Sequence, residues 1–125
     1  FAEKYYNKLN SKISYSCGTF EKSERYSPTT ALLAAKKNDV DLQNHKSNYL
    51  NDLKVNLSSS IFFVMNTKQY ILLSKEKKYE NVYFLSVFNK KNSLVIKDPY
   101  YNPYELKTYS KIFDQIKSNI DLMLK

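Results

Sequence analysis

Residues 81–101 read NVYFLSVFNKKNSLVIKDPYY, and this stretch decides the predicted fold. Val82–Phe88 is β-branched or aromatic at almost every position, which is typical of a strand covered on both faces. Residues 89–92 form a polar break of the length that joins hairpin strands, and Ser93–Lys97 resumes as a second strand. Pro99 stops that strand, because proline donates no ladder hydrogen bond. The stretch therefore predicts a central hairpin that ends in a carboxylate.

That carboxylate is Asp98, and its position leaves two interpretations open. Asp-Pro is a common turn pair, so Asp98 can be a purely structural turn residue. A carboxylate fixed at the end of a buried strand can also be a positioned catalytic group. The hairpin alone does not decide between the two roles.

Three segments carry helical patterns. In Phe1–Leu9, apolar residues recur at every fourth position and form one face. Ser27 is a good N-cap and Pro28 suits the first helical position, so a helix follows through Lys37. Ser110 can cap a third, short helix. Tyr49–Leu53 predicts a weak helical turn.

The remaining segments predict a loop and a sheet. Asn10–Arg25 is polar, holds the only glycine and predicts a loop. Two apolar runs with four polar residues between them predict a first hairpin. The predicted strands outside the central hairpin are Val40–Leu42, Ser60–Met65, Tyr70–Ser74 and Ile120–Leu124. Helices segregated from an antiparallel sheet give an α+β fold, with the N-terminal helices packed on the sheet.

Composition limits the possible classes of protein. A chain of 125 residues predicts one domain, 1–125, and because it starts at Phe1 we expect a fragment of a longer chain. No apolar run reaches the ~18 residues that cross a bilayer, so we expect no direct membrane insertion. The net charge is +8, but only one of the 20 basic residues is arginine, whereas base readout favours arginine. Lysine, asparagine and tyrosine also have AT-rich codons, and we expect no nucleic-acid partner.

The sequence offers little independent chemistry. One histidine, one cysteine and no acidic cluster of metal-binding spacing argue against a metal, and a lone glycine argues against a phosphate-binding glycine-rich loop. A thiol nucleophile needs a neighbouring base. Cys17 and His45 are the candidates of these types. Each lies in a polar stretch, where a free thiol and a surface histidine are the default interpretations, and no sequence feature brings them together.

From Ser27 to its end the chain resembles the bacteriocin-processing cysteine peptidases, papain-like domains of peptidase-containing ABC exporters that cleave leader peptides. The matching segments are two helices and three predicted strands, which read TTALLAAKK (29–37), VYFLSVF (82–88), SLVIKDP (93–99), YSKIFDQI (109–116) and IDLML (120–124). The resemblance implies a papain-like fold, no cofactor, and a catalytic His–Asp pair on the central hairpin. It places these two positions at Asn81 and Asp98.

The chain departs from the family's catalytic pattern. Asn81 cannot act as a base, since an amide does not take a proton from a thiol. The resemblance places the nucleophile upstream of Phe1 or, in a second register, at residues 26–28, which hold no cysteine, so it is uncertain from the sequence whether the chain is an enzyme. The resemblance therefore implies a non-catalytic peptidase-like domain that binds transported peptide or protein cargo. Its partners would be the membrane and ATPase domains of the same exporter, at the cytoplasmic face of the cell membrane. Tyr83, Tyr100 and Tyr101 are the predicted cargo-binding residues, because tyrosine offers a large contact surface with a polar tip.

Two alternatives stay open. An active cysteine peptidase would need a cysteine upstream of Phe1 and a base such as His45. A small basic module for nucleic acid or an anionic surface would bind with an affinity that falls steeply with salt. AT-rich composition and ordinary core packing would account for most of the tyrosines without any binding role.

Overall fold

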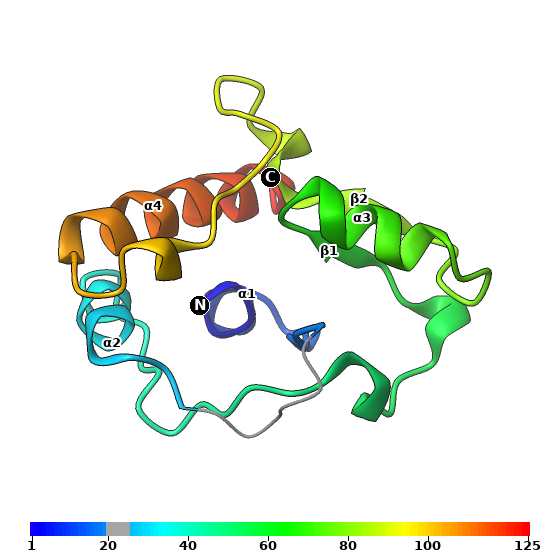
Figure 1. Cartoon of the computed structure of the whole chain (residues 1–125), viewed down its shortest axis with the longest axis horizontal. Coiled ribbons are helices and arrows are strands. Elements are labelled where there is room, and N and C mark those ends of the chain that lie inside the picture. Colours follow the sequence, from blue (N-terminus) through cyan, green and yellow to red (C-terminus); the bar gives the residue numbers. More distant parts are fainter. Residues whose placement is uncertain (20–25) are drawn as a thin grey trace.

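The computed structural model describes residues 1–19 and 26–125. Its longer elements are four helices and two short strands, and short 3-10 segments lie between α2 and β1 and between β2 and α4 (Figure 1). In chain order they are α1 (Ala2–Leu9), α2 (Thr29–Lys36), η1 (Leu50–Asp52), η2 (Leu57–Ser59), β1 (Phe62–Val64), α3 (Thr67–Ser74), β2 (Val82–Phe84), η3 (Leu85–Phe88), η4 (Pro99–Tyr101) and α4 (Leu106–Met123).

The sheet is parallel. β1 pairs with β2 in the register Phe62 to Val82 and Val64 to Phe84, and α3 connects them as a crossover helix. Ile96 extends this region, because its N–H donates to the carbonyl of Met65 just beyond β1, at 2.8 Å. The segment after η3 therefore passes the carboxyl end of β1.

The main core lies around α4. Figure 1 shows α1 end-on, between α2, α4 and the β1–α3–β2 unit, and α1, α2 and η3 all pack against α4. Ala34 and Ala35 are fully buried, which lets α2 approach closely. The α4 face is a continuous apolar stripe formed by Tyr109, Ile112, Phe113, Ile116 and Ile120. A smaller cluster under α3 contains Val64, Leu73 and Tyr79.

The predicted first hairpin is wrong, because its second strand is a helix. Residues 67–74 form α3, and the polar stretch that was expected to be a hairpin turn is the start of this helix. Asn66 accepts a hydrogen bond from the Gln69 N–H at 2.9 Å, and the Gln69 side chain accepts one from the Met65 N–H at 2.9 Å. This reciprocal arrangement is close to a capping box. It makes the connection a crossover, so β1 and β2 run parallel.

The central hairpin is also wrong. The strand stops at Phe84, and residues 85–88 turn into η3. Residues 93–97 join no strand ladder of the described chain, although Ile96 is only 2% exposed. The α+β fold with an antiparallel, papain-like sheet is therefore contradicted, and the chain has a parallel sheet with helical connections.

The helix predictions had mixed outcomes. The Phe1–Leu9 helix is confirmed as α1 and the helix after Ser27 is confirmed as α2, although Pro28 occupies the N-cap position. The predicted strand Ile120–Leu124 is wrong, since α4 runs through Met123, and the short helix from Ser110 is part of α4. Val40 and Leu42 are buried, but the structure assigns no strand there. The turn at residues 49–53 is confirmed as η1.

The loop prediction for Asn10–Arg25 is only partly covered by the structure. Its first ten residues contain no helix, and Gly18 forms an isolated parallel bridge with Tyr49. Residues 20–25 lie outside the described residues.

Candidate functional site

A cleft of about 200 Å³ opens at the carboxyl end of the parallel sheet. It is lined by Met65, Asn66 and Gln69 after β1, by residues 96–99, and by three apolar residues of α4, which are Ile112, Phe113 and Ile116. In open α/β sheets, ligands bind in the crevice outside the carboxyl ends of the strands. This cleft is therefore the candidate functional site.

Asp98 is the acidic residue of the cleft. Its side chain is exposed and N-caps η4, where one carboxylate oxygen accepts a hydrogen bond from the Tyr100 N–H at 2.9 Å. Pro99 fixes the first position of that turn. Burial raises the pKa of the Tyr109 phenol, and electrostatic interaction with Asp98 and Tyr100 raises it further. The carboxylate is thus held in place at the mouth of the cleft, close to the aromatic core.

The amide residues Asn66 and Gln69 also line the cleft. Both are engaged in capping α3, so they present a fixed polar surface to the cleft. The apolar side is rigid as well. Phe113 packs edge-on against Tyr109 with ring centroids 6.0 Å apart and stacks on Phe1 at 4.3 Å. The cleft therefore offers the carboxylate of Asp98, the ammonium group of Lys97, two amides and an apolar wall that includes Phe113.

The structure does not bring Asn81 and Asp98 together as a pair. Asn81 precedes β2, and its carbonyl accepts the Phe62 N–H at 2.8 Å. It therefore lies at the amino end of the sheet, whereas Asp98 lines the cleft at the carboxyl end. The interpretation of the two as remnants of a catalytic pair depended on the peptidase resemblance.

The three predicted binding tyrosines divide into two groups. Tyr100 and Tyr101 are in η4 beside Asp98, and each is about two-thirds exposed. Tyr83 is half exposed on β2, where its ring lies 6.5 Å from that of Phe63. Only the first two share a turn with the carboxylate. Whether any of the three contacts a substrate stays a prediction.

Cys17 and His45 share one neighbour, Glu3 of α1. Partial burial raises the pKa of the Cys17 thiol, and the Glu3 charge raises it further. Burial lowers the pKa of His45, while Glu3 opposes that effect. Glu3 also accepts a hydrogen bond from the Ser16 N–H at 2.7 Å, which fixes the loop. No hydrogen bond joins the thiol to the imidazole among residues 1–19 and 26–125, and a raised pKa keeps the thiol in its unreactive form.

Sequence reasoning missed Asn66 and Gln69, which it assigned to a turn. The signal was present, since Asn-x-x-Gln before an apolar run is a helix-start pattern. In the described ranges, no three acidic, histidine or cysteine residues are grouped so as to hold a metal ion. None of the described helices combines the length and the apolar character needed to span a membrane.

No protein-family model matches the chain, and no curated protein matches it. Solved structures do match. Wzb of Vibrio vulnificus in complex with benzylphosphonate has a TM-score of 0.81 at 19% identity, over 98% of this chain and 85% of that chain. A low molecular weight protein tyrosine phosphatase from T. tengcongensis gives 0.80 at 21%, over 98% and 86%. The YwlE arginine phosphatase of Geobacillus stearothermophilus gives 0.78 at 17%, over 98% and 79%.

These matches contradict the peptidase resemblance. The neighbours are phosphatases, so the bacteriocin-processing family, the cargo-binding function and the exporter membrane and ATPase partners are all withdrawn. The expected place at the cytoplasmic face of the membrane came only from that resemblance, and neither structure nor comparison tests it. Identities below 25% establish the fold alone. The chain has the fold of the low molecular weight protein tyrosine phosphatases, an α/β fold with a parallel sheet.

Proposed function

We propose that this protein is a phosphatase that removes phosphoryl groups from protein side chains. The observation that carries the proposal is the match of 98% of the chain, at TM-scores near 0.8, to structures named as tyrosine and arginine phosphatases. Fold alone does not fix function. The cleft at the carboxyl end of the sheet supports the proposal with a carboxylate at the place where such folds bind ligands.

Hydrolysis of a phosphate monoester makes specific demands on a site. The P–O bond to the side chain breaks, water supplies the oxygen that ends on phosphate, and the departing side-chain oxygen must gain a proton. A protonated carboxyl within reach of that oxygen can donate the proton. Asp98 is exposed in the cleft and held by the Tyr100 N–H, so we assign it the role of proton donor.

We do not assign the attacking group to Cys17. The thiolate, not the thiol, is the nucleophile, and the surroundings of Cys17 raise its pKa. We assign recognition of the substrate's side chain to Tyr100 and Tyr101, whose exposed rings flank the Asp98 turn. Aromatic rings can stack on a flat phosphorylated side chain such as phosphotyrosine.

The test uses the full-length protein and three variants. Asp98→Asn removes the transferable proton but keeps an oxygen that can cap η4, as Asn66 caps α3 in the same chain. Asp98→Ala removes both. Asp114→Asn, at an exposed carboxylate on α4, is the matched control. The kcat/KM values for phosphotyrosine, phosphoarginine and aryl phosphates with different leaving groups are measured for each variant.

We expect Asp98→Asn to lower kcat/KM about 10²- to 10⁴-fold while thermal stability stays near that of the wild type. The loss should shrink for aryl phosphates whose leaving group needs no proton. Asp114→Asn should have wild-type activity. Absence of phosphatase activity in the full-length wild-type protein rejects the function. Equal losses for good and poor leaving groups would reject the role of Asp98 alone.

A further inference from the structure

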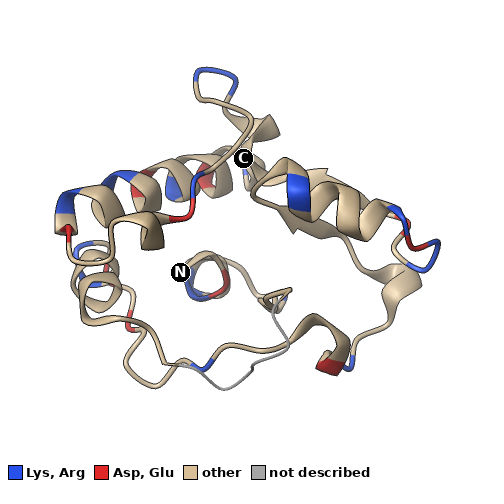
Figure 2. Ribbon diagram, in the orientation of Figure 1, with Lys and Arg blue, Asp and Glu red and all other residues tan. Residues whose placement is uncertain are grey.

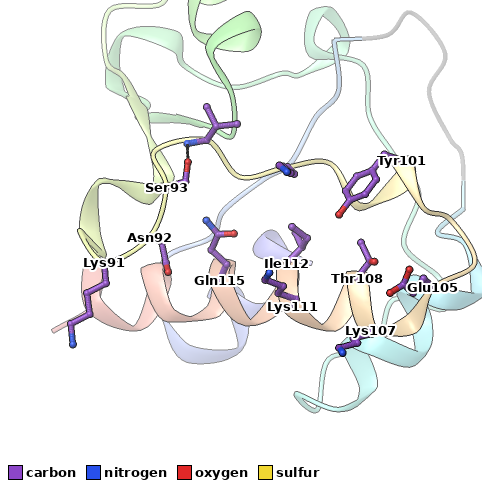
Figure 3. Close-up of a pocket in the computed structure, with 12 residues that line it drawn as sticks. Lys91, Asn92, Ser93, Tyr101, Glu105, Lys107, Thr108, Lys111, Ile112 and Gln115 are labelled. Carbon is purple, nitrogen blue, oxygen red and sulfur yellow. Dashed lines mark hydrogen bonds between the residues drawn. The ribbon is translucent and has the colours of Figure 1, made fainter.

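A second and larger depression lies on the outer side of the cleft. It has a volume of about 570 Å³ and runs between residues 91–101 and α4 (Figure 3). We call it the lysine groove, and its twelve lining residues are Lys91, Asn92, Ser93, Val95, Lys97, Tyr101, Glu105, Lys107, Thr108, Lys111, Ile112 and Gln115. Its size falls within the range of binding pockets.

The charge of the lysine groove is strongly unbalanced. Four of its residues are lysines and Glu105 is its only acid. Asn102 donates a hydrogen bond to the carboxylate of Glu105, which holds that charge at one end of the groove. Within the described residues, no carboxylate lies within ion-pairing distance of any of these four lysines. Figure 2 shows basic residues at the tip of the loop that precedes η4 and at intervals along α4, where acidic residues also occur. The positive charge of the groove is therefore not neutralised by ion pairs within the described residues.

The shape of the groove suits an extended ligand. In Figure 3, Lys91 and Asn92 lie toward one end, Glu105 and Thr108 lie toward the other, and Gln115 and Ile112 rise from α4 between them. The α4 segment from Lys107 to Gln115 is about 12 Å long at 1.5 Å per residue, which equals about four residues of extended peptide. Exposed hydroxyl and amide groups can bond such a backbone.

The lysine groove adjoins the candidate active site. Lys97 and Ile112 line both the groove and the cleft that contains Asp98. Tyr101, which lines the groove, is in the same turn that Asp98 caps. A peptide whose phosphorylated side chain entered the cleft could therefore lay its neighbouring residues along the groove.

We propose that the lysine groove binds an acidic stretch of the substrate, next to its phosphorylated residue. The proposal deepens the proposed phosphatase function and rests on it. It names the substrate class as phosphoproteins with several Asp or Glu residues on one side of the phosphorylated position. A carboxylate-rich segment matches four lysines that lack acidic partners, and an extended segment matches a groove about four residues long.

The experiment compares two phosphotyrosine peptides on the full-length protein, one flanked by four Glu and one by four Gln, with each flank tested in turn. Lys107→Glu combined with Lys111→Glu reverses the charge of the groove. Lys12→Glu combined with Lys54→Glu is the control, because both lysines are exposed, neither lines the groove, and the net charge changes equally. Fluorescence anisotropy of the unphosphorylated Glu peptide measures binding without catalysis.

We expect the wild type to favour the Glu peptide about two- to tenfold in kcat/KM at low salt, and this preference should fade in 0.5 M salt. The groove variant should lose the preference and the control variant should keep it. Equal kcat/KM for both peptides, or equal effects of both double variants, would overturn the groove proposal and leave the phosphatase function standing. Absence of turnover, with groove-dependent binding of the Glu peptide, would instead overturn the phosphatase function. Binding of pyrophosphate but not of the Glu peptide would assign the groove to a small anion and overturn the proposal that it binds an acidic peptide.

Discussion

The buried amide of Asn119 supports the sharpest structural prediction. Asn119 is fully buried on α4, where its side-chain oxygen accepts the Asn89 N–H at 2.8 Å and its side-chain nitrogen donates to the Gln115 carbonyl at 2.9 Å. Asn89 follows η3 and begins the loop that forms one wall of the lysine groove. Replacing Asn119 by Ala should therefore both destabilise the protein and loosen that wall.

The expected magnitude follows from the two bonds. A neutral hydrogen bond contributes about 0.5–1.5 kcal/mol, and a buried donor left without a partner costs about 1–3 kcal/mol. In the variant the backbone N–H of Asn89 loses its acceptor, whereas the Gln115 carbonyl can keep its backbone hydrogen bond within α4. The unpaired Asn89 N–H therefore accounts for most of the lost stability. We expect the free energy of unfolding to fall by about 2–4 kcal/mol. For 125 residues, 1 kcal/mol corresponds to about 4 °C, so the melting temperature should fall by about 8–15 °C.

Denaturant unfolding with an unchanged m value measures this loss. Asn119→Leu separates volume from hydrogen bonding, because it fills the site but offers no acceptor, and we expect it to lose at least about 1 kcal/mol. Ser118→Ala is the control. It removes a partly buried hydroxyl that accepts a hydrogen bond from the Asn89 side chain at 2.8 Å and donates one to the Gln115 carbonyl at 3.3 Å, and it should cost under about 1 kcal/mol. Amide hydrogen exchange should rise at residues 89–95 in Asn119→Ala. If Asn119→Leu were as stable as the wild type, the amide would not be holding the loop.

Three further predictions concern other contacts. Burial and the 2.5 Å hydrogen bond to Asp121 raise the pKa of Tyr5 to about 12. The neutral phenol of Tyr5 therefore contributes its full stabilisation of the folded state below pH 10, and this stabilisation is lost as the pH rises through 12. The stability gap between wild type and Tyr5→Phe, about 1–2 kcal/mol at pH 8, should close over that range in pH-dependent unfolding, and a constant gap would contradict the shift. Iodoacetamide should alkylate Cys17 more slowly in the folded than in the unfolded protein at pH 8, because the raised pKa lowers the thiolate fraction. Glu3→Gln should speed alkylation of the folded protein. If it did not, the Glu3 charge would be excluded as a cause of the raised pKa. Thr30→Val removes a 2.8 Å bond from α2 to a carbonyl of the loop before α4, and should lower the melting temperature by about 4 °C in calorimetry, while an unchanged value would show that the bond contributes nothing.

Local patterns were enough for the helices near the start of the chain. The apolar face of residues 1–9 and the proline-led start of α2 are short-range signals, and both helices form where they were expected. Asp98 was also identified as a notable position, because Asp-Pro after an apolar run marks a fixed turn. In α4, a helical repeat through Ile112, Ile116 and Ile120 was present but was divided between a helix and a strand.

The direction of the strands could not be predicted from the same kind of information. An apolar run of three to six residues has the same local preferences in a parallel and in an antiparallel pair, and the connection between the runs decides which forms. Here the decision lay with Asn66 and Gln69, whose mutual capping turns residues 67–74 into α3. Two misassigned segments, residues 67–74 and residues 85–97, gave the antiparallel sheet, and the second of them carried the peptidase resemblance.

The sequence by itself determined the apolar periodicity of its helices, its surplus of lysine and the fixed turn at Asp98, because each depends on residues within a few positions of one another. The cleft and the lysine groove arise only from the tertiary structure. Asn66, Asp98 and Phe113 come from three separate segments, and Lys97 and Lys111 face one groove only because residues 91–101 run beside α4. Such neighbours are set by parallel strand pairing and burial of the α4 stripe, which are long-range interactions that no short window of sequence contains.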